Sequence, residues 1–294
     1  TAPSSDCSLK GVDTGRLTPP TVPRAARSRK SLPSCPVSAQ PPPEGPVHPS
    51  EGWGVVHLFT RADRGEDARP VLRAIEAFTA DDPNQVIACS VLGGRADVGL
   101  MALSPDLDAL DRLTKQVLAG PLEAVYSFVS LTEGSEYTST EDDERARLAA
   151  AGEEATEERM AAWRERMDHY LDARLHPRLP QRRLLAFYPM AKRRQGDDNW
   201  YSLPFEDRRE LMQGHAMVGR RFAGRILQLI TGATGLDDWE WGVTLLADDP
   251  VAVKQIVYEM RFDEVSARYG EFGPFYVGLV MDPGAALARA GLTT

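Results

Sequence analysis

The chain has 294 residues, of which 42% are hydrophobic and 26% charged, and its formal net charge at pH 7 is −9. This length suits one or two domains, and the composition is that of an ordinary globular protein. The acidic balance argues against general nucleic-acid binding, which needs a basic face, and no apolar run approaches the roughly 18 residues of a membrane span.

The first fifty residues differ from the rest. They hold eleven of the 22 prolines and a group of Arg and Lys side chains, and they lack the apolar core of a secretory signal. A transit peptide is an alternative, because the segment is rich in Ser and Arg, but so many prolines oppose an amphipathic helix. We therefore predict that residues 1–50 form a disordered, Pro-rich extension.

The three cysteines show neither CxxC nor zinc-ligand spacing. Cys7 and Cys35 fall in the extension, and Cys89 lies in an apolar segment typical of a core strand. A disulfide framework or a cysteine-based metal site is therefore not expected. The default is then a reducing compartment, and we expect a cytoplasmic protein.

Residues 51–180 are predicted to form an N-terminal ferredoxin-like unit followed by a charged connector. Periodicity predicts a β-α-β-β-α-β order, with strands at 53–60, 85–93, 96–104 and 123–133 and helices at 65–80 and 105–120. The connector, residues 134–180, is rich in charge and Ala and is expected to be a solvated helix or a flap over a cleft.

Residues 181–294 repeat the same order. Strands are predicted at 182–190, 221–231, 239–247 and 272–281, and helices at 204–220 and 249–262. The expected fold class is therefore α+β, with duplicated ferredoxin-like units that form a dimeric α/β-barrel within one chain. Such an architecture offers a ligand pocket between one sheet and its helices.

One of the five histidines, His215, falls in the middle of a predicted helix, on an apolar stripe with Leu211 and Val218. It is either a hydrogen-bonded core residue or a ligand. A single imidazole without a second His, Cys or carboxylate cluster suits zinc poorly. It is sufficient for the iron of a porphyrin, which brings four nitrogens of its own.

The segment FYPMAKRRQGDDNWYSLP, residues 187–204, runs from an apolar strand into a group of cations. Strand alternation puts Tyr188 and Met190 on one face, and Lys192 continues that direction. These residues either pack in a core with a lysine at its mouth, or direct a phenol and an ammonium group at a bound small anion.

Further polar candidates lie in the predicted C-terminal unit. Gln228 shares a strand face with Ile226 and Ile230, so it is either a neutral amide in a pocket wall or a core residue bonded to the backbone. Ser266 and Tyr269 are candidates for contacts with an anionic ligand, within a charged segment that structural ion pairs otherwise explain.

Four segments together are recognisable: FYPMAKRR followed by DDNWYSLP, GHAMVGR, GLDDWEWGVTLLADDP and YEMRFDEVSARYGEFGPFYVG. They resemble the chlorite-dismutase-like superfamily, and within it the coproheme decarboxylases of Gram-positive type. The resemblance covers residues 53–135 loosely and 174–281 closely. It implies the duplicated ferredoxin-like barrel and a homopentameric ring.

The resemblance also implies a reaction, the last step of a haem pathway that uses coproporphyrin. Iron coproporphyrin III loses carbon dioxide from two propionates in turn, which leaves vinyl groups and gives haem b. Hydrogen peroxide is the oxidant, and the substrate itself supplies the iron, so no separate metal is expected.

Residue roles follow from the same resemblance. His215 corresponds to the axial ligand of the porphyrin iron, and Tyr188 to the tyrosine whose radical abstracts hydrogen from a propionate. Lys192 corresponds to the lysine near the reactive propionates. The remaining implied substrate-binding residues are Arg174, Tyr137, Met190, Gln228 and Ser266.

Two alternatives stay open. A haem-binding or haem-transfer protein without turnover would keep His215 but would not need Tyr188. A chlorite dismutase or haem peroxidase is disfavoured by Gln228, because chlorite breakdown needs a cation where glutamine offers only dipoles.

Overall fold

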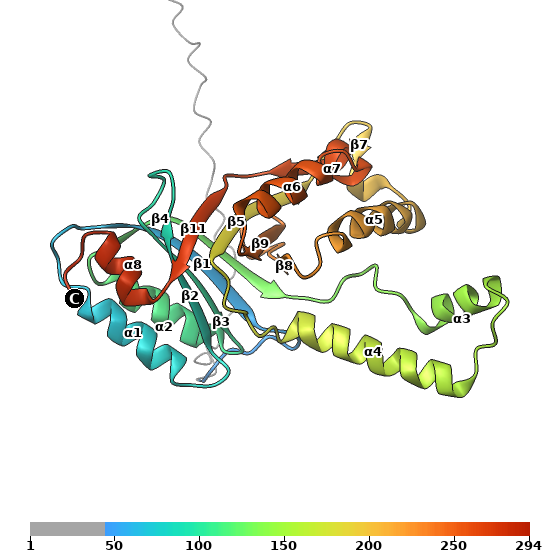
Figure 1. Cartoon of the computed structure of the whole chain (residues 1–294), viewed down its shortest axis with the longest axis horizontal. Coiled ribbons are helices and arrows are strands. Elements are labelled where there is room, and N and C mark those ends of the chain that lie inside the picture. The colour runs from blue at the N-terminus through green and yellow to red at the C-terminus, as the bar shows by residue number, and fades with distance from the viewer. Residues whose placement is uncertain (1–44) are drawn as a thin grey trace, which may run out of the picture. The chain divides into compact units, whose positions relative to one another are not determined.

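The computed structural model describes residues 45–294 (Figure 1). Most of the predicted disordered extension, residues 1–44, lies outside the described residues. Residues 45–50 run beside a helix of the folded part, where the backbone N–H of Leu107 donates to the Val47 carbonyl over 2.9 Å.

The N-terminal half follows the predicted element order. Its elements are β1 (Gly54–Ala62), α1 (Arg69–Thr79), β2 (Gln85–Val91), β3 (Val98–Ser104), α2 (Leu107–Leu118) and β4 (Leu122–Thr132). A proline in the first turn favours the start of α1, and the Asp106 side chain caps α2 by accepting a hydrogen bond from Asp108 N. Local sequence therefore fixes both helix starts.

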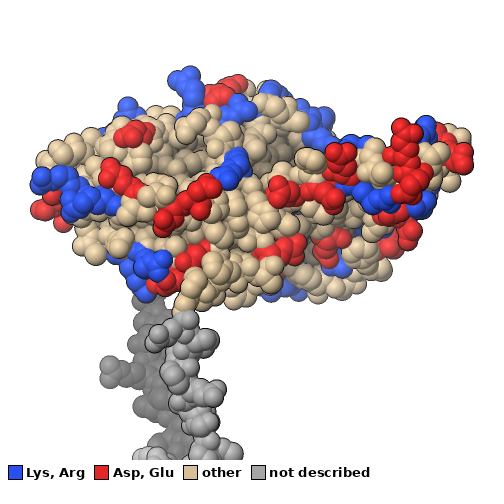
Figure 2. Space-filling view, turned by 90° about the horizontal axis from the view of Figure 1, so that it is seen from below, with Lys and Arg blue, Asp and Glu red and all other residues tan. Residues whose placement is uncertain are grey.

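The charged connector forms two helices, α3 (Glu141–Ala150) and α4 (Glu157–Leu175). Thr140 and Asp143 make a reciprocal capping box at the start of α3, and Thr156 caps α4. Acidic and basic side chains alternate over both helices in ion pairs such as Arg145–Glu141. Figure 2 shows the two signs interspersed over this part of the surface.

The C-terminal half contains the remaining elements. They are β5 (Leu184–Lys192), β6 (Arg194–Gln195), β7 (Asp198–Asn199), η1 (Trp200–Ser202), α5 (Phe205–Arg220), β8 (Ile226–Gly232), β9 (Trp241–Ala247), α6 (Pro250–Met260), α7 (Glu264–Tyr269), β10 (Gly270–Phe272), β11 (Tyr276–Met281) and α8 (Pro283–Arg289). The β8 strand begins five residues later than predicted. A turn with Gly224 at φ 81° separates it from α5.

Nine of the described strands form one sheet in the order β10-β5-β11-β2-β3-β1-β4-β8-β9, with a further pairing of β9 with β5, while β6 and β7 form a separate two-stranded sheet. Every ladder in the larger sheet is antiparallel. The two halves of the chain meet at two of these ladders, β2 with β11 and β4 with β8. The protein thus has a mixed α+β fold with one large antiparallel sheet.

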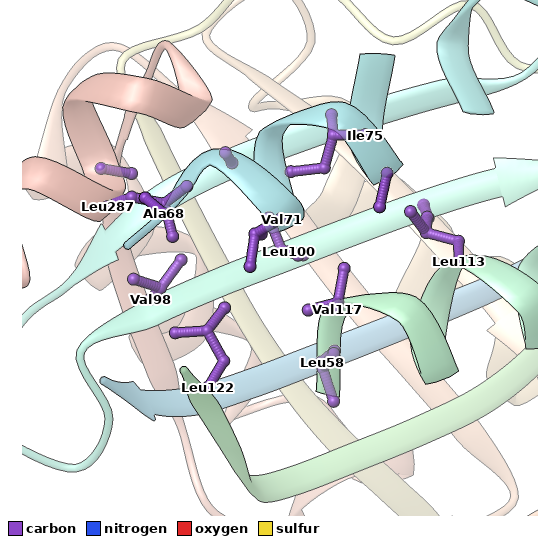
Figure 3. Packing of buried hydrophobic residues seen from close by; sticks show 14 of the residues in the cluster. Leu58, Ala68, Val71, Ile75, Val98, Leu100, Leu113, Val117, Leu122 and Leu287 are labelled. Carbon is purple, nitrogen blue, oxygen red and sulfur yellow. The ribbon is translucent and has the colours of Figure 1, made fainter. Parts of the chain in front are cut away.

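Helices cover the sheet in two groups. Helices α1, α2 and α8 lie over the N-terminal strands, while α5, α6 and α7 lie near β5, β8 and β9 (Figure 1). Figure 3 shows Val71 and Ile75 of α1 and Val117 of α2 packed against strand residues such as Leu58 and Leu100. Full burial of such a side chain contributes about 1.5–3 kcal/mol, so these contacts hold the helices to the strands.

No helix among the described residues is both long and apolar enough to span a membrane.

Candidate functional site

The residues singled out in the C-terminal half come from four elements near one another. Strand β5 carries Tyr188, Met190 and Lys192, helix α5 carries His215, strand β8 carries Gln228, and helix α7 carries Ser266. Strand β9 pairs with both β5 and β8, and α5 packs against α6 and α7. The site is therefore built from one helical layer and the strands beneath it.

His215 is held by a carboxylate. Its Nδ1 lies 3.1 Å from Asp263 Oδ1, and the histidine side chain is 21% exposed. When Nδ1 carries the proton and donates to Asp263, Nε2 keeps a free lone pair. A carboxylate on the far nitrogen is the usual partner of a metal-bound histidine, because it orients the ring and raises its basicity.

Asp263 also belongs to the helix that carries Ser266. It caps α7, accepting a hydrogen bond from Ser266 N at 3.2 Å. Burial acts to raise the pKa of Asp263, but the hydrogen bonds and charge from His215 and Ser266 outweigh burial and lower it. Asp263 therefore remains an anion behind the imidazole, and the buried Ser266 lies next to this pair.

Lys192 is buried, with 7% of its surface exposed. Its Nζ lies 4.6 Å from the centre of the Trp200 ring, and its backbone N–H donates to Glu240 Oε2 over 2.7 Å. Burial lowers the pKa of Lys192 to about 8, while the charges of Asp263 and Glu240 act in the opposite direction. Asp263 therefore affects both residues that the sequence indicated: it hydrogen-bonds His215, and its charge favours the protonated form of Lys192.

Tyr188 lies in an apolar cluster on the same strand face. It is 6% exposed, and its ring stacks on Phe275 with ring centres 4.4 Å apart. Burial raises the pKa of Tyr188 to about 12, with an opposing effect from the Arg261 charge. Met190 packs against the same cluster, so at neutral pH the phenol is protonated and surrounded by hydrocarbon.

Gln228 contacts the helix that carries His215. Its Nε2 donates to the Gly219 carbonyl over 3.4 Å, and Gly219 follows His215 by one helical turn. Helix α5 and strand β8 therefore touch at this point. Insertion of a flat ligand between them requires this long hydrogen bond to open.

Glycines flank His215 on α5. A Cβ at Gly214 would meet no atom within 4 Å, whereas a Cβ at Gly219 would lie 3.1 Å from Gln228 Nε2. The helix thus lacks bulk beside the imidazole. The site thus combines an imidazole oriented by a carboxylate with a buried ammonium group, which suits a metal-bearing ligand with anionic groups.

Tyr137 and Arg174 are placed differently. Tyr137 precedes α3 and packs near Trp200 and Leu211, so it joins the surroundings of Lys192. Arg174, on α4, donates to the Glu133 carbonyl at 3.2 Å and to the Tyr170 hydroxyl at 3.3 Å. None of the described hydrogen bonds or ion pairs of Arg174 reaches the His215 group.

Asp263 and Arg261 are residues near the site that the sequence pattern does not indicate. Both lie in the segment YEMRFDEVSARYGEFG, most of whose charges are expected from the sequence to form structural ion pairs. An Asp three residues before Ser266 is a helix-cap pattern that could have been recognised. Nothing in the spacing links Asp263 to His215, because 48 residues separate them.

The described surface hollows lie elsewhere. One is lined by residues around β4 and β8, including Glu133 and Leu236, and the other by α4 residues such as His169 and Tyr170. Tyr188, Lys192 and His215 line neither of them.

Comparison with known proteins defines the class. The sequence pattern of the family described as chlorite dismutase matches residues 64–281. The chain therefore belongs to the chlorite dismutase family.

Individual relatives give more specific information than the family match. Two proteins named coproheme decarboxylase, from two strains of Thermus thermophilus, are each 40% identical over 265 residues, covering 84% of this chain and 97% of theirs. A solved structure described as a heme-binding protein from Thermus thermophilus has 38% identity and a TM-score of 0.66, covering 82% of this chain and 96% of that one.

A mutant chlorite dismutase from Candidatus Nitrospira defluvii has the same fold at 13% identity. Its TM-score is 0.61, and the match covers 83% of this chain and 97% of that one. At this identity the likeness concerns the fold alone.

Proposed function

We propose that this chain is a coproheme decarboxylase, an enzyme that converts iron coproporphyrin III to haem b with hydrogen peroxide. Each step turns one propionate, one peroxide and one proton into a vinyl group, one carbon dioxide and two waters. The 40% identical relatives with that name support the proposal. The observation that carries it is the arrangement of Lys192 and His215 around Asp263, with Tyr188 on the same strand as Lys192.

His215 is the proposed axial ligand of the substrate iron, through Nε2, with Asp263 holding Nδ1. The iron porphyrin itself supplies the redox chemistry once peroxide is present. The contribution of His215 is to fix the position of the ring.

Tyr188 is the proposed acceptor of hydrogen from the propionate β carbon. Burial raises the pKa of Tyr188 to about 12, so the phenol keeps its proton at neutral pH. To become the radical that takes the hydrogen atom, Tyr188 must lose this proton together with an electron. The surrounding Phe272 and Phe275 rings keep water away from the reacting carbon.

Lys192 is proposed to hold the carboxylate of the same propionate. With a pKa of about 8 it is mainly an ammonium ion at pH 7. Its charge keeps the propionate ionised, which is the form that leaves as carbon dioxide. Met190, Gln228, Ser266, Tyr137 and Arg174 are proposed as further contacts to the porphyrin or its propionates.

The finer description of the fold is also a proposal. We infer two ferredoxin-like units, residues 51–180 with the connector and residues 181–294, that join into one barrel. The pairing of β5 with β9, in addition to its pairings with β10 and β11, supports closure of the sheet. A homopentamer is proposed from the resemblance alone, and a cytoplasmic location from the cysteine spacing, which makes a reducing compartment the default.

The test is direct. Pure protein is mixed with iron coproporphyrin III, peroxide is titrated, and porphyrin masses are followed. Two successive losses of carbon dioxide with two hydrogens are expected. An unchanged substrate mass in the presence of tight binding would refute decarboxylation.

A haem-binding protein without turnover is the second candidate. It is favoured by the description of the 38% identical structure and by the close packing of the Tyr188 ring against Phe275. It predicts tight porphyrin binding, no mass change on peroxide addition, and no difference between wild type and Tyr188→Phe.

A further inference from the structure

Arg208 lies on α5 two turns before His215. Seven residues of helix span about 10 Å, and residues seven apart lie on the same side of a helix. The distance is comparable to that from the centre of a porphyrin to a carboxylate on its rim. Arg208 is therefore placed to meet such a carboxylate when His215 binds the iron.

The Arg208 side chain is 18% exposed, and its Nε is buried with no hydrogen-bond partner among the described residues. The carboxylate of Glu136 lies 3.9 Å from its Nη1, too far for a hydrogen bond, and is itself more than half exposed. A guanidinium group normally satisfies its buried N–H groups, because an unmade hydrogen bond to a charged donor is costly.

A second donor without a partner lies beside it. The Tyr137 hydroxyl is also buried and makes no hydrogen bond of normal geometry within the described part of the chain, although Glu136 and Trp200 lie near it. Burial raises the pKa of Tyr137, and Arg208 acts in the opposite direction, so the phenol is protonated and near the guanidinium.

The Phe205 ring fixes both donors. The Tyr137 ring stacks on it with centres 5.8 Å apart, and the Arg208 guanidinium carbon lies 5.7 Å from its centre. A planar guanidinium and a phenol O–H held in this way offer several hydrogens to one acceptor. A carboxylate is the group that accepts them most favourably, because the guanidinium fork matches its two oxygens.

We propose that Arg208, together with Tyr137, binds a rim carboxylate of the porphyrin that the reaction leaves in place. This inference rests on the proposed function for the identity of the ligand. Tyr137 was expected to contact a propionate, and Arg208 is the new member of the site. Tyr137 and Arg208 both lie beside Phe205 at the start of α5, and Tyr188 packs in a separate cluster with Phe275, so we assign the pair a carboxylate other than the one that Lys192 holds.

The experiment measures dissociation constants by absorption titration without peroxide. The proteins are wild type, Arg208→Gln, Arg208→Lys and Arg221→Gln. The last is a matched control, since Arg221 lies at the other end of α5 and pairs with Glu259 at 2.9 Å. The ligands are iron coproporphyrin III, haem b and iron coproporphyrin III tetramethyl ester.

We expect Arg208→Gln to weaken binding of both acids roughly 10- to 100-fold, the effect of losing a charged hydrogen-bond donor. Arg208→Lys keeps the charge but loses the fork, so its loss should be smaller. Binding of the ester should not change, and Arg221→Gln should match wild type throughout. Equal binding of the acids by wild type and Arg208→Gln would overturn the inference, as would an equal loss for acid and ester.

Peroxide is then added to separate the two proposals. Decarboxylation by wild type combined with unchanged affinity in Arg208→Gln would leave the function standing and remove the Arg208 site. Binding of iron coproporphyrin III that depends on Arg208 but yields no mass change would keep the carboxylate site and remove the enzyme activity.

Discussion

Lys192 illustrates how burial gives a residue its properties. Its ammonium group faces the Trp200 ring, and the nearby charges of Asp263 and Glu240 offset part of the desolvation that lowers its pKa. A cation over an aromatic ring is stabilised by about 0.5–2 kcal/mol, depending on its exposure to water. The group therefore remains charged at neutral pH but titrates within an accessible range.

We predict that substrate binding weakens as the pH rises through about 8. Below that pKa Lys192 is protonated and attracts a propionate, and above it the attraction is lost. From about pH 7 to about pH 9 the protonated fraction of a group with this pKa falls about tenfold, so the affinity should fall by up to the same factor. Titrations of iron coproporphyrin III across this range measure the effect.

The control variant is Lys192→Arg, which stays charged because an arginine pKa exceeds about 12. Its affinity should be nearly independent of pH in the same range. A pH dependence shared by wild type and Lys192→Arg would assign the titration to another group.

Periodicity predicted those site residues that it places on a buried face, whereas Tyr137 and Arg174 were indicated only by the resemblance. The alternation of β5 placed Tyr188, Met190 and Lys192 on one face, and the apolar stripe of α5 turned His215 inward. Asp263 could not be linked to His215, since that contact depends on how α7 packs against α5. The burial of Tyr188 among aromatic rings also follows from tertiary packing alone.

Helix α5 connects the proposed iron ligand with the proposed carboxylate-binding residue. It carries His215 and Arg208, and at Gly219 it approaches β8 closely enough to contact Gln228. A glycine in a helix interior costs up to about 1 kcal/mol relative to alanine. We therefore attribute Gly219 to the close contact between α5 and β8, where a larger side chain would press against Gln228.

We predict that Gly219→Leu weakens iron coproporphyrin binding and does not stabilise the protein, because the buried Gly219 already lies close to Gln228 and Met260. Leucine favours the helix intrinsically, but its side chain would enter the space between α5 and β8, so iron coproporphyrin affinity should fall by at least about tenfold. Thermal unfolding and absorption titration measure the two effects. Gly219→Ala is the control, because a single methyl group need displace only the flexible end of Gln228. Unchanged binding by Gly219→Leu would place the ligand elsewhere.

The elements were largely predictable because hydrophobic periodicity and helix caps are local. The beginning of β8 was misplaced because Phe222 continues the apolar pattern through a turn that Gly224 completes. Helix α7 was missed because its six residues are too few to show a helical period amid so many charges.

At the scale of the whole molecule, the halves of the chain are joined by strand pairing and by a buried contact. The Nε2 atom of His57, on β1, lies 2.8 Å from the hydroxyl oxygen of Thr244, on β9. The His57 ring also stacks on the Phe187 ring of β5, with ring centres 4.1 Å apart. Burial lowers the pKa of His57 to about 3, so this histidine is neutral and structural. The C-terminal strands that carry the site therefore pack against strands of the N-terminal half.

Pairing between distant strands could not be read from spacing. The repeated β-α-β-β-α-β order predicted two units, but the ladders β2–β11 and β4–β8 join strands far apart in sequence. The repeat led to the expectation that the two units join into one barrel, but it did not indicate which strands pair, because periodicity describes each strand separately.

In the proposed function, His215 fixes an iron porphyrin while Tyr188 reacts with one of its propionates. The most direct measurement is peroxide-driven turnover of iron coproporphyrin III by wild type, Tyr188→Phe and the exposed control Tyr258→Phe, followed by porphyrin mass. Wild type and Tyr258→Phe should produce haem b, whereas Tyr188→Phe should bind the substrate with similar affinity and leave its mass unchanged. Haem b formation by Tyr188→Phe at the wild-type rate would contradict this role of Tyr188.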